Sequence, residues 1–485
     1  MLSGQAQFRL LIGSLVFGSL LLSGCEFVDD QRKASPERAE IANPRPLIAN
    51  ARAQNERHRV LVAVIDTGVD YLHPELQKNI HLQLDPQGNP LRWGWDYLGE
   101  DGWPAPLLVR TVDINPDVGD RDHRQSEFMG KMYEDGLRLV PELSRFINPV
   151  RIADTEARMF HGTHVAGLMT YDRDDIGLLA YRVMPMNRKE GRGLISDPED
   201  KKNKWPSFGK ASRQYADAMA EYRKESLQNL ERAFHQAIAD GATVINLSLG
   251  LSPALSCLKE GFQSPKCEAT DREFYQKMQK LITSAENVVF VAAAGNDGKS
   301  FDGAEVLPCG FEADNLICVG ALKNEKTVAE FSNIALKHKN FVFAPGVQIL
   351  SLMPTSICHS ALIPGASKVG TYDRDDEPTR LQMWEEVLKQ CSAETGYGPV
   401  SGTSMATPLI ARQIALLKAD APAKKGSEIV REFFARTLSV EVQGTPYRRF
   451  DVEAPSWTKG KGLYLPIKAG GKGTIPFFLP NVHSI

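Results

Sequence analysis

Short, continuous apolar runs rich in β-branched residues appear four times along the chain. They cover residues 60–65, 243–249, 288–294 and, more weakly, 316–322. Runs of this length without polar alternation are typical of strands that are buried on both faces, as in a parallel sheet. The pattern therefore predicts buried strands at these four places.

A helical pattern precedes the second of these runs. Its apolar residues fall on one face, at Leu227, Leu230, Phe234, Ala237 and Ile238. The pair Asp240-Gly241 follows, where glycine suits the left-handed cap that ends a helix. Buried strands that alternate with amphipathic helices indicate an α/β fold with three layers, a mostly parallel central sheet and helices on both of its faces.

The N-terminus has the pattern of an export signal. Arg9 precedes an uncharged apolar run over residues 10–22, which is too short for a transmembrane helix of roughly 20 residues. A cationic start, a short apolar stretch and small residues at its end predict a secretory signal peptide over residues 1–24. The polar, proline-containing stretch after it predicts a tether over residues 25–57.

The end of the apolar run, Leu22-Ser23-Gly24-Cys25, resembles the lipobox of bacterial lipoproteins. This resemblance implies secretion across the cytoplasmic membrane, cleavage before Cys25 and lipid on that cysteine. The protein would then be anchored in the bacterial cell envelope, with the membrane as a partner through its lipid. An ordinary signal peptide that happens to contain a cysteine is the alternative.

Composition and charge give no indication of a particular partner. The 485 residues are 42% apolar and 24% charged, close to the averages for globular proteins. The net charge of -3 provides no electrostatic reason to expect nucleic acid or an anionic membrane surface. The length allows one large domain with insertions.

Six cysteines follow Cys25, an even number in a compartment that permits disulfides. Pairing between neighbours in the sequence is the simplest arrangement, and free buried thiols or other pairings are the alternatives. It would give the bridges Cys257–Cys267, Cys309–Cys318 and Cys358–Cys391. Because no CxxC pair occurs, the spacing does not predict a structural metal.

The rest of the chain divides into one domain with additions. We expect the main domain over residues 58–440 and a C-terminal extension over residues 441–485. Three polar stretches match no core element and are expected to be surface insertions, either solvated loops or contacts for substrate or a regulator. These insertions lie near residues 98–158, 188–223 and 356–392.

Three motifs supply the groups that a serine hydrolase needs: a carboxylate, a base and a hydroxyl nucleophile. Asp66 ends the first buried run, in VAVIDTGVD, and His161 opens HGTHVAGLM. Ser404 lies in SGTSMATP, a glycine-containing turn that leads into an apolar helix, whose N-terminus favours a negative intermediate. Each motif alone is weak evidence, since an aspartate that ends a strand is often only a turn residue.

Together, DTG, HGTHVAG and GTSMATP resemble the signature motifs of the subtilisin-like serine proteases, in that family's order of Asp, His and Ser. The segments NLSLG, AAAGNDG, FSN and APGVQILS between them also match. The resemblance implies a subtilisin-like fold and an acyl-enzyme mechanism with Asp66, His161 and Ser404 as the catalytic triad. It makes His161, rather than His164, the base.

The same resemblance implies further site residues. Asn296 would donate its side-chain amide to the oxyanion, and Ser248, Leu249 and Gly250 would pair with the backbone of a peptide or protein substrate. No cofactor or catalytic metal is expected. Calcium is common in the family, but no loop has a convincing ligand spacing for it.

There are two alternatives to a serine endopeptidase. His161 and His164 could hold a metal by spacing alone, yet no carboxylate of the HExxH kind accompanies them. A catalytically silent, subtilisin-fold binding lipoprotein is the second alternative, and the intact set of site residues speaks against it. A structural role in the envelope is compatible with catalysis.

Overall fold

The computed structural model describes residues 48, 50–105, 132, 135–145, 160–183, 224, 227–250, 265–301, 306–335, 337–354, 374–394, 396–442, 445–452 and 455–456. All of them belong to one compact unit, residues 42–485.

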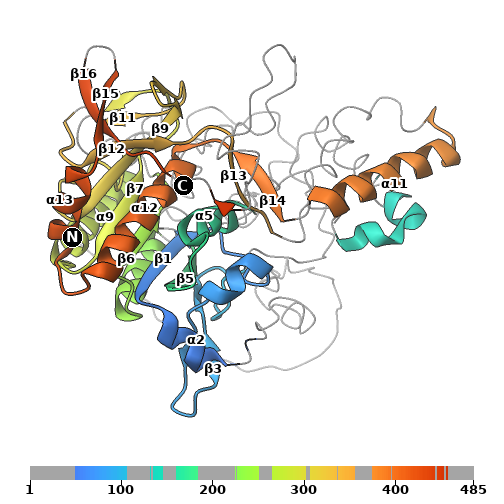
Figure 1. The fold of residues 1–485 in the computed structure, drawn as a ribbon, viewed down its shortest axis with the longest axis horizontal. Coiled ribbons are helices and arrows are strands. Elements are labelled where there is room, and N and C mark those ends of the chain that lie inside the picture. The colour runs from blue at the N-terminus through green and yellow to red at the C-terminus, as the bar shows by residue number, and fades with distance from the viewer. Residues whose placement is uncertain are drawn as a thin grey trace, which may run out of the picture. The chain divides into compact units, whose positions relative to one another are not determined.

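A ten-stranded sheet forms the centre of this unit (Figure 1). Along its main path the order is β15-β16-β12-β9-β7-β6-β1-β5-β4, with β10 paired to β9. The pairs β15–β16 and β9–β10 are antiparallel, and the other neighbours are parallel. The strands are β1 (Val60–Asp66), β4 (Gly94–Asp96), β5 (Ile176–Arg182), β6 (Val244–Leu247), β7 (Val289–Ala293), β9 (Leu316–Asn324), β10 (Thr327–Val328), β12 (Phe341–Pro345), β15 (Leu438–Val442) and β16 (Thr445–Arg449).

The four apolar runs correspond to β1, β6, β7 and β9, so the predicted buried strands are confirmed. The alternation of side chains along β1 shows why its run is apolar throughout. Val62 and Val64 pack on one face of the sheet, and Ala63 and Ile65 pack on the other.

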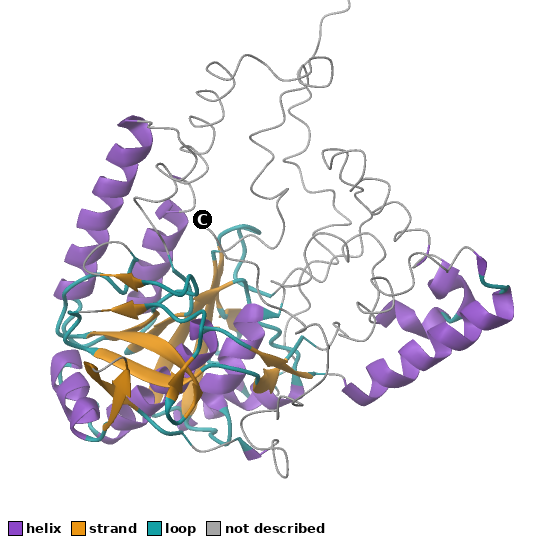
Figure 2. Cartoon of the chain, turned by 90° about the horizontal axis from the view of Figure 1, so that it is seen from above, coloured by secondary structure: helices purple, strands orange, loops and turns teal. Residues whose placement is uncertain are grey.

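Helices cover both faces of the sheet, as predicted (Figure 2). On the face of Val62 lie α5 (His161–Thr170), α12 (Thr403–Asp420) and α13 (Gly426–Ala435). A helix over residues 227–239 and α9 (Pro265–Ser284) pack on the opposite face. Gly241 has a φ of 93°, the left-handed conformation expected after the first of these.

Smaller elements complete the described residues. They are α2 (Ala51–Arg57), η1 (Pro74–Asn79), β2 (Gln83–Leu84), β3 (Pro90–Arg92), η2 (Pro141–Arg145), β8 (Ser300–Phe301), β11 (Ile334–Ala335), β13 (Ile349–Leu352), α11 (Glu377–Glu394) and β14 (Tyr397–Val400). Strands β13 and β14 form an antiparallel pair, and so do β2 and β3. No described helix combines the length and hydropathy needed to cross a membrane.

The predicted tether is not extended throughout its length. Its last residues form α2, which is capped by the Asn50 side chain. Gln54 is buried there and donates hydrogen bonds to the carbonyls of Gln77 and Ile80. These contacts are with residues more than twenty positions away in the sequence. The stretch itself shows only its polar composition, which is why it predicted a linker.

The predicted boundary at residue 440 also differs from the structure, since it divides the β15–β16 hairpin. Strand β16 pairs in parallel with β12, so the sheet continues to Arg449. The Tyr447 ring packs edge-on against Phe341 and Phe343 of β12. The first part of the expected C-terminal extension is therefore part of the sheet.

Two of the expected insertions contribute a small hydrophobic core of their own, which we call the satellite cluster. Its buried residues come from the 98–158 stretch and from α11 in the 356–392 stretch. They are Met132, Val140, Leu143, Trp384 and Val387. The described parts of these insertions are thus not merely solvated loops, whereas the 188–223 insertion lies outside the described residues.

One of the three predicted disulfides can be compared with the structure. Cys309 and Cys318 are bonded, with their Cα atoms 5.0 Å apart, which confirms this pairing. The side chains of the other four cysteines lie outside the described residues, as does Cys25.

Candidate active site

Asp66 and His161 meet at the carboxyl end of β1. The Asp66 Oδ1 atom lies 2.7 Å from His161 Nδ1 and also accepts a hydrogen bond from the Thr67 N–H. Asp66 is fully buried and His161 is 6% exposed. With Nδ1 donating to the carboxylate, Nε2 of the imidazole is the nitrogen that can accept a proton.

The contact between Asp66 and His161 requires the backbone at the start of α5 to lie close to the backbone after β1. A Cβ on Gly162 would lie 2.2 Å from the carbonyl oxygen of Gly68, so the first turn of α5 fits against the end of β1 only with glycine here. The Gly162 N–H donates to Thr67 Oγ1, and the Asp70 N–H donates to Thr163 Oγ1. These bonds tie the start of the helix to the DTG turn.

Ser404 occupies the second position of α12 and is 7% exposed. Its hydroxyl donates to the Ser248 carbonyl at 3.0 Å, and the Ser248 hydroxyl donates back to the Ser404 carbonyl at 2.8 Å. Asn246 Nδ2 donates to the Ser248 hydroxyl in turn. The segment after β6 is therefore bonded directly to the turn that presents Ser404.

Asn296 lies beside the same helix terminus. Its Oδ1 atom accepts hydrogen bonds from the Thr403 N–H at 2.9 Å and from Thr403 Oγ1 at 3.0 Å. This arrangement satisfies one of the N–H groups that have no partner inside the helix. It also fixes the orientation of the Asn296 amide.

Two nitrogen donors and the Met405 sulfur lie near one point next to Gly402. A Cβ placed on Gly402 would lie 3.6 Å from Asn296 Nδ2 and 3.7 Å from the Ser404 backbone nitrogen. Within the described residues neither nitrogen donates a hydrogen bond. Two free donors at a helix N-terminus suit a small anion or a developing negative charge.

The structure thus forms three local contacts among the residues singled out from the sequence: Asp66 with His161, Ser404 with Ser248, and Asn296 with the turn before Ser404. In the described residues no hydrogen bond joins Ser404 to His161. Their helices, α5 and α12, pack against each other. Leu249 is buried and Gly250 is partly exposed, in the loop that follows β6.

Three supporting residues were inside recognised motifs, but their roles were not apparent from the sequence. Thr67 and Thr403 hold the turns of the DTG and GTS motifs through the bonds described above. Asn333, in the FSN motif, accepts hydrogen bonds from the N–H groups of Asp297 and Lys299 and donates one to the Ala294 carbonyl. It therefore holds the loop that presents Asn296.

His164 has a structural position in the core. It is fully buried, and its Nε2 atom lies 3.0 Å from the Ile349 carbonyl of β13 and 3.2 Å from the Gly398 carbonyl of β14. No group of three or more potential metal ligands of the His, Cys, Asp or Glu type occurs among the described residues.

Comparison with known proteins adds independent information. The model of the subtilase family matches residues 57–451. Subtilisin DY of Bacillus licheniformis is 27% identical over 195 residues, which make up 40% of this chain and 48% of that protein. The alignment thus spans about half the length of this relative.

Similar solved structures include two proteases. A cold-adapted subtilisin-like serine proteinase is 17% identical, with 84% of this chain and 93% of that chain covered and a TM-score of 0.39. A lanthipeptide protease is 18% identical, with 81% and 87% covered and a TM-score of 0.42.

Proposed function

The chain belongs to the subtilase family of serine-type endopeptidases, and from this membership and the site geometry we propose that it hydrolyses peptide bonds with Asp66, His161 and Ser404. The observation that carries the proposal is the buried 2.7 Å contact between Asp66 and His161, with Ser404 in the first turn of the adjacent helix. Peptide or protein substrates follow from this chemistry.

Acylation would begin with a change of hydrogen-bond partner. The Ser404 hydroxyl leaves the Ser248 carbonyl and donates to His161 Nε2, which takes its proton as Oγ attacks the scissile carbonyl carbon. Asp66 stabilises the imidazolium that forms. His161 then returns the proton to the leaving amine as the C–N bond breaks, leaving an acyl group on Ser404. His161 then takes a proton from a water molecule as the water oxygen attacks the acyl carbon. The bond from that carbon to Ser404 Oγ breaks, the acid leaves, and the imidazolium returns its proton to Oγ.

The oxyanion would occupy the point beside Gly402 that Asn296 Nδ2 and the Ser404 N–H surround. Both donors are held before substrate arrives, because Thr403 orients the asparagine amide and α12 fixes the backbone nitrogen. Preorganised donors stabilise a transition state without reorganisation during the reaction. The backbone of Ser248, Leu249 and Gly250 would pair with the substrate chain next to the scissile bond.

Active-site labelling tests this function. The purified protein should react covalently with a fluorophosphonate probe and cleave a mixed peptide library, and Ser404→Ala should do neither while remaining folded at the assay temperature. His161→Ala should lower kcat by at least about 10³-fold. A wild-type protein that binds peptides but is neither labelled nor catalytically active would instead be a silent binding module.

We also propose, from the lipobox resemblance alone, that Cys25 carries lipid and anchors the protease in the bacterial cell envelope after secretion. Metabolic labelling with a fatty-acid analogue in the native host should mark the wild-type protein and not Cys25→Ala. Equal labelling of both proteins would contradict the anchor without affecting the protease proposal.

A further inference from the structure

The helices that carry His161 and Ser404 share a buried polar contact away from those two side chains. Arg412 of α12 donates from Nη2 to the carbonyl of Tyr171 at 3.1 Å. Its guanidinium carbon also lies 3.9 Å from the centre of the Tyr171 ring. Arg412 is 9% exposed, and Tyr171, the C-cap residue of α5, is 3% exposed.

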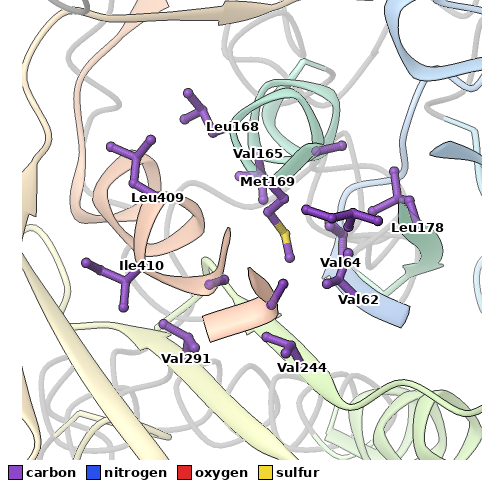
Figure 3. Close-up of a cluster of buried hydrophobic side chains, with 14 of the residues drawn as sticks. Val62, Val64, Val165, Leu168, Met169, Leu178, Val244, Val291, Leu409 and Ile410 are labelled. Atoms are coloured by element: carbon purple, nitrogen blue, oxygen red, sulfur yellow. The ribbon is translucent and has the colours of Figure 1, made fainter. Parts of the chain in front are cut away.

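This contact differs in kind from the packing around it. Figure 3 shows aliphatic side chains of both helices over the sheet, including Val165 and Leu168 of α5 and Leu409 and Ile410 of α12. Aliphatic contacts are non-directional, so they oppose separation of two helices more than sliding or rotation. A guanidinium bonded to a fixed carbonyl has a preferred direction and opposes both.

Burying a guanidinium is unfavourable unless its hydrogen-bonding capacity is used. Here it lies at the C-terminus of α5, where carbonyl groups have no partner inside the helix and the helix dipole favours a cation. The face of the Tyr171 ring adds a cation–π interaction. Arg412 therefore meets the end of α5 through one hydrogen bond and one cation–π contact, both with Tyr171.

The positions along the two helices give this contact a mechanical consequence. Arg412 lies eight residues after Ser404, about 12 Å along α12, and Tyr171 lies ten residues after His161, about 15 Å along α5. The contact thus joins the middle of α12 to the C-terminus of α5, and the first turns of these two helices carry the reacting groups. Because a displacement of about 1 Å can lower the rate of a positioned reaction about 10²-fold, a small relative shift of α5 and α12 would matter.

We propose that Arg412 and Tyr171 form an interhelical clamp that sets the alignment of His161 with Ser404. Arg412 is a positioning residue, since it acts through the two helices and touches no reacting atom. The inference rests on the proposed function and extends it to a residue outside the active-site motifs.

The test replaces Arg412 with methionine, which keeps most of the length of the side chain without its charge. Arg412→Met should lower kcat about 10- to 100-fold and change KM less than about threefold. The rate of Ser404 labelling by a fluorophosphonate at saturation should fall by the same factor. Measurements are made well below the melting temperature of every variant.

Lys418→Met is the matched control. Lys418 lies on the same helix, is 2% exposed and donates from Nζ to the carbonyls of Pro422 and Lys424 beyond the end of α12. Its replacement should also lower the melting temperature but leave kcat and the labelling rate within about twofold of wild type. If both variants lose kcat in proportion to their loss of stability, Arg412 has only a structural role and the clamp is wrong.

Variants of the partner residue complete the test. Tyr171→Phe keeps the ring face and the carbonyl, so its kcat should stay within about threefold of wild type. Tyr171→Leu removes the ring and should lower kcat. In a double-mutant cycle, Arg412→Met should have a smaller effect in the Tyr171→Leu background. Fully additive effects on kcat would overturn the clamp. A wild-type protein that is never labelled would contradict the proposed function instead, and the cycle would then be measured on thermal stability.

Discussion

Asn296 has one side-chain oxygen and one side-chain nitrogen, and the site uses them differently. The oxygen is occupied by Thr403, whereas the nitrogen faces the point beside Gly402 without a partner in the described residues. A side chain that served only to cap α12 would need the oxygen alone. The spare donor is the feature that fits stabilisation of an oxyanion.

Asn296→Leu should therefore lower kcat with little change in KM, because the donor acts mainly in the transition state. The loss known for the corresponding asparagine of subtilisin, about 10²–10³-fold, sets the scale. Asn340→Leu is a control, since Asn340 also bonds backbone carbonyls, those of Ala313 and Leu316 among them, but away from α12. A rise in KM with unchanged kcat for Asn296→Leu would argue for a substrate-binding role instead.

At the scale of elements, a pair of histidines joins α2 to the chain just after η1. The Nδ1 atoms of His58 and His81 lie 3.0 Å apart, and His58 Nε2 donates to the Lys78 carbonyl. His58 Nδ1 must therefore accept the proton that His81 Nδ1 donates, which requires a neutral His58. Burial lowers the pKa of both imidazoles, that of His81 to about 4.

This pair should make the fold acid-sensitive. The unfolded chain takes up protons as the pH falls below about 6.5, while folded His81 resists protonation until about pH 4. Stability contributed by the neutral pair is thus present above pH 6.5 and falls as the pH drops towards 4, by up to about 1.4 kcal/mol per pH unit for one histidine.

Denaturant melts at pH 7 and pH 5 measure the effect. His81→Gln should lose less stability between these two pH values than wild type, whereas His235→Gln, whose side chain is exposed, should lose as much as wild type. The same acid loss in all three proteins would exclude the His58–His81 pair as its source.

At the scale of the whole molecule, two insertions distant in sequence share one core. The satellite cluster joins α11 to residues 132 and 135–143. Ion pairs reinforce it between Asp135 and Arg380 at 3.0 Å and between Arg138 and Glu377 at 2.9 Å. Trp384 is fully buried, and a Cβ on Gly136 would lie 2.4 Å from its ring. One stretch ends shortly before His161, and the other ends shortly before Ser404.

Because this cluster has its own small core, it should open independently of the main sheet. Trp384→Ala removes its largest side chain and should lower the local stability of α11 by about 3–5 kcal/mol. Hydrogen exchange followed by mass spectrometry should show faster exchange in α11 but not in β1 or β6. Glu385→Ala, on the exposed side of the same helix, should leave exchange unchanged. Equal acceleration in the sheet would mean that the two cores unfold together.

The sequence by itself determined the buried strands, the helix over residues 227–239 and the motifs that carry Asp66, His161 and Ser404. These follow from local periodicity and from short segments whose residues act near one another. It could not determine which atom of Asn296 is occupied or that Asn333 holds its loop. Those contacts join segments about 34 to 107 positions apart.

Only the tertiary structure decided that residues 51–57 fold as a helix, that β16 extends the sheet past residue 440 and that two polar insertions share a buried tryptophan. It also placed Arg412 at the end of α5, which no motif near Arg412 indicates. Polar residues can be satisfied by water or by a distant part of the same chain, and only the folded chain determines which of these occurs.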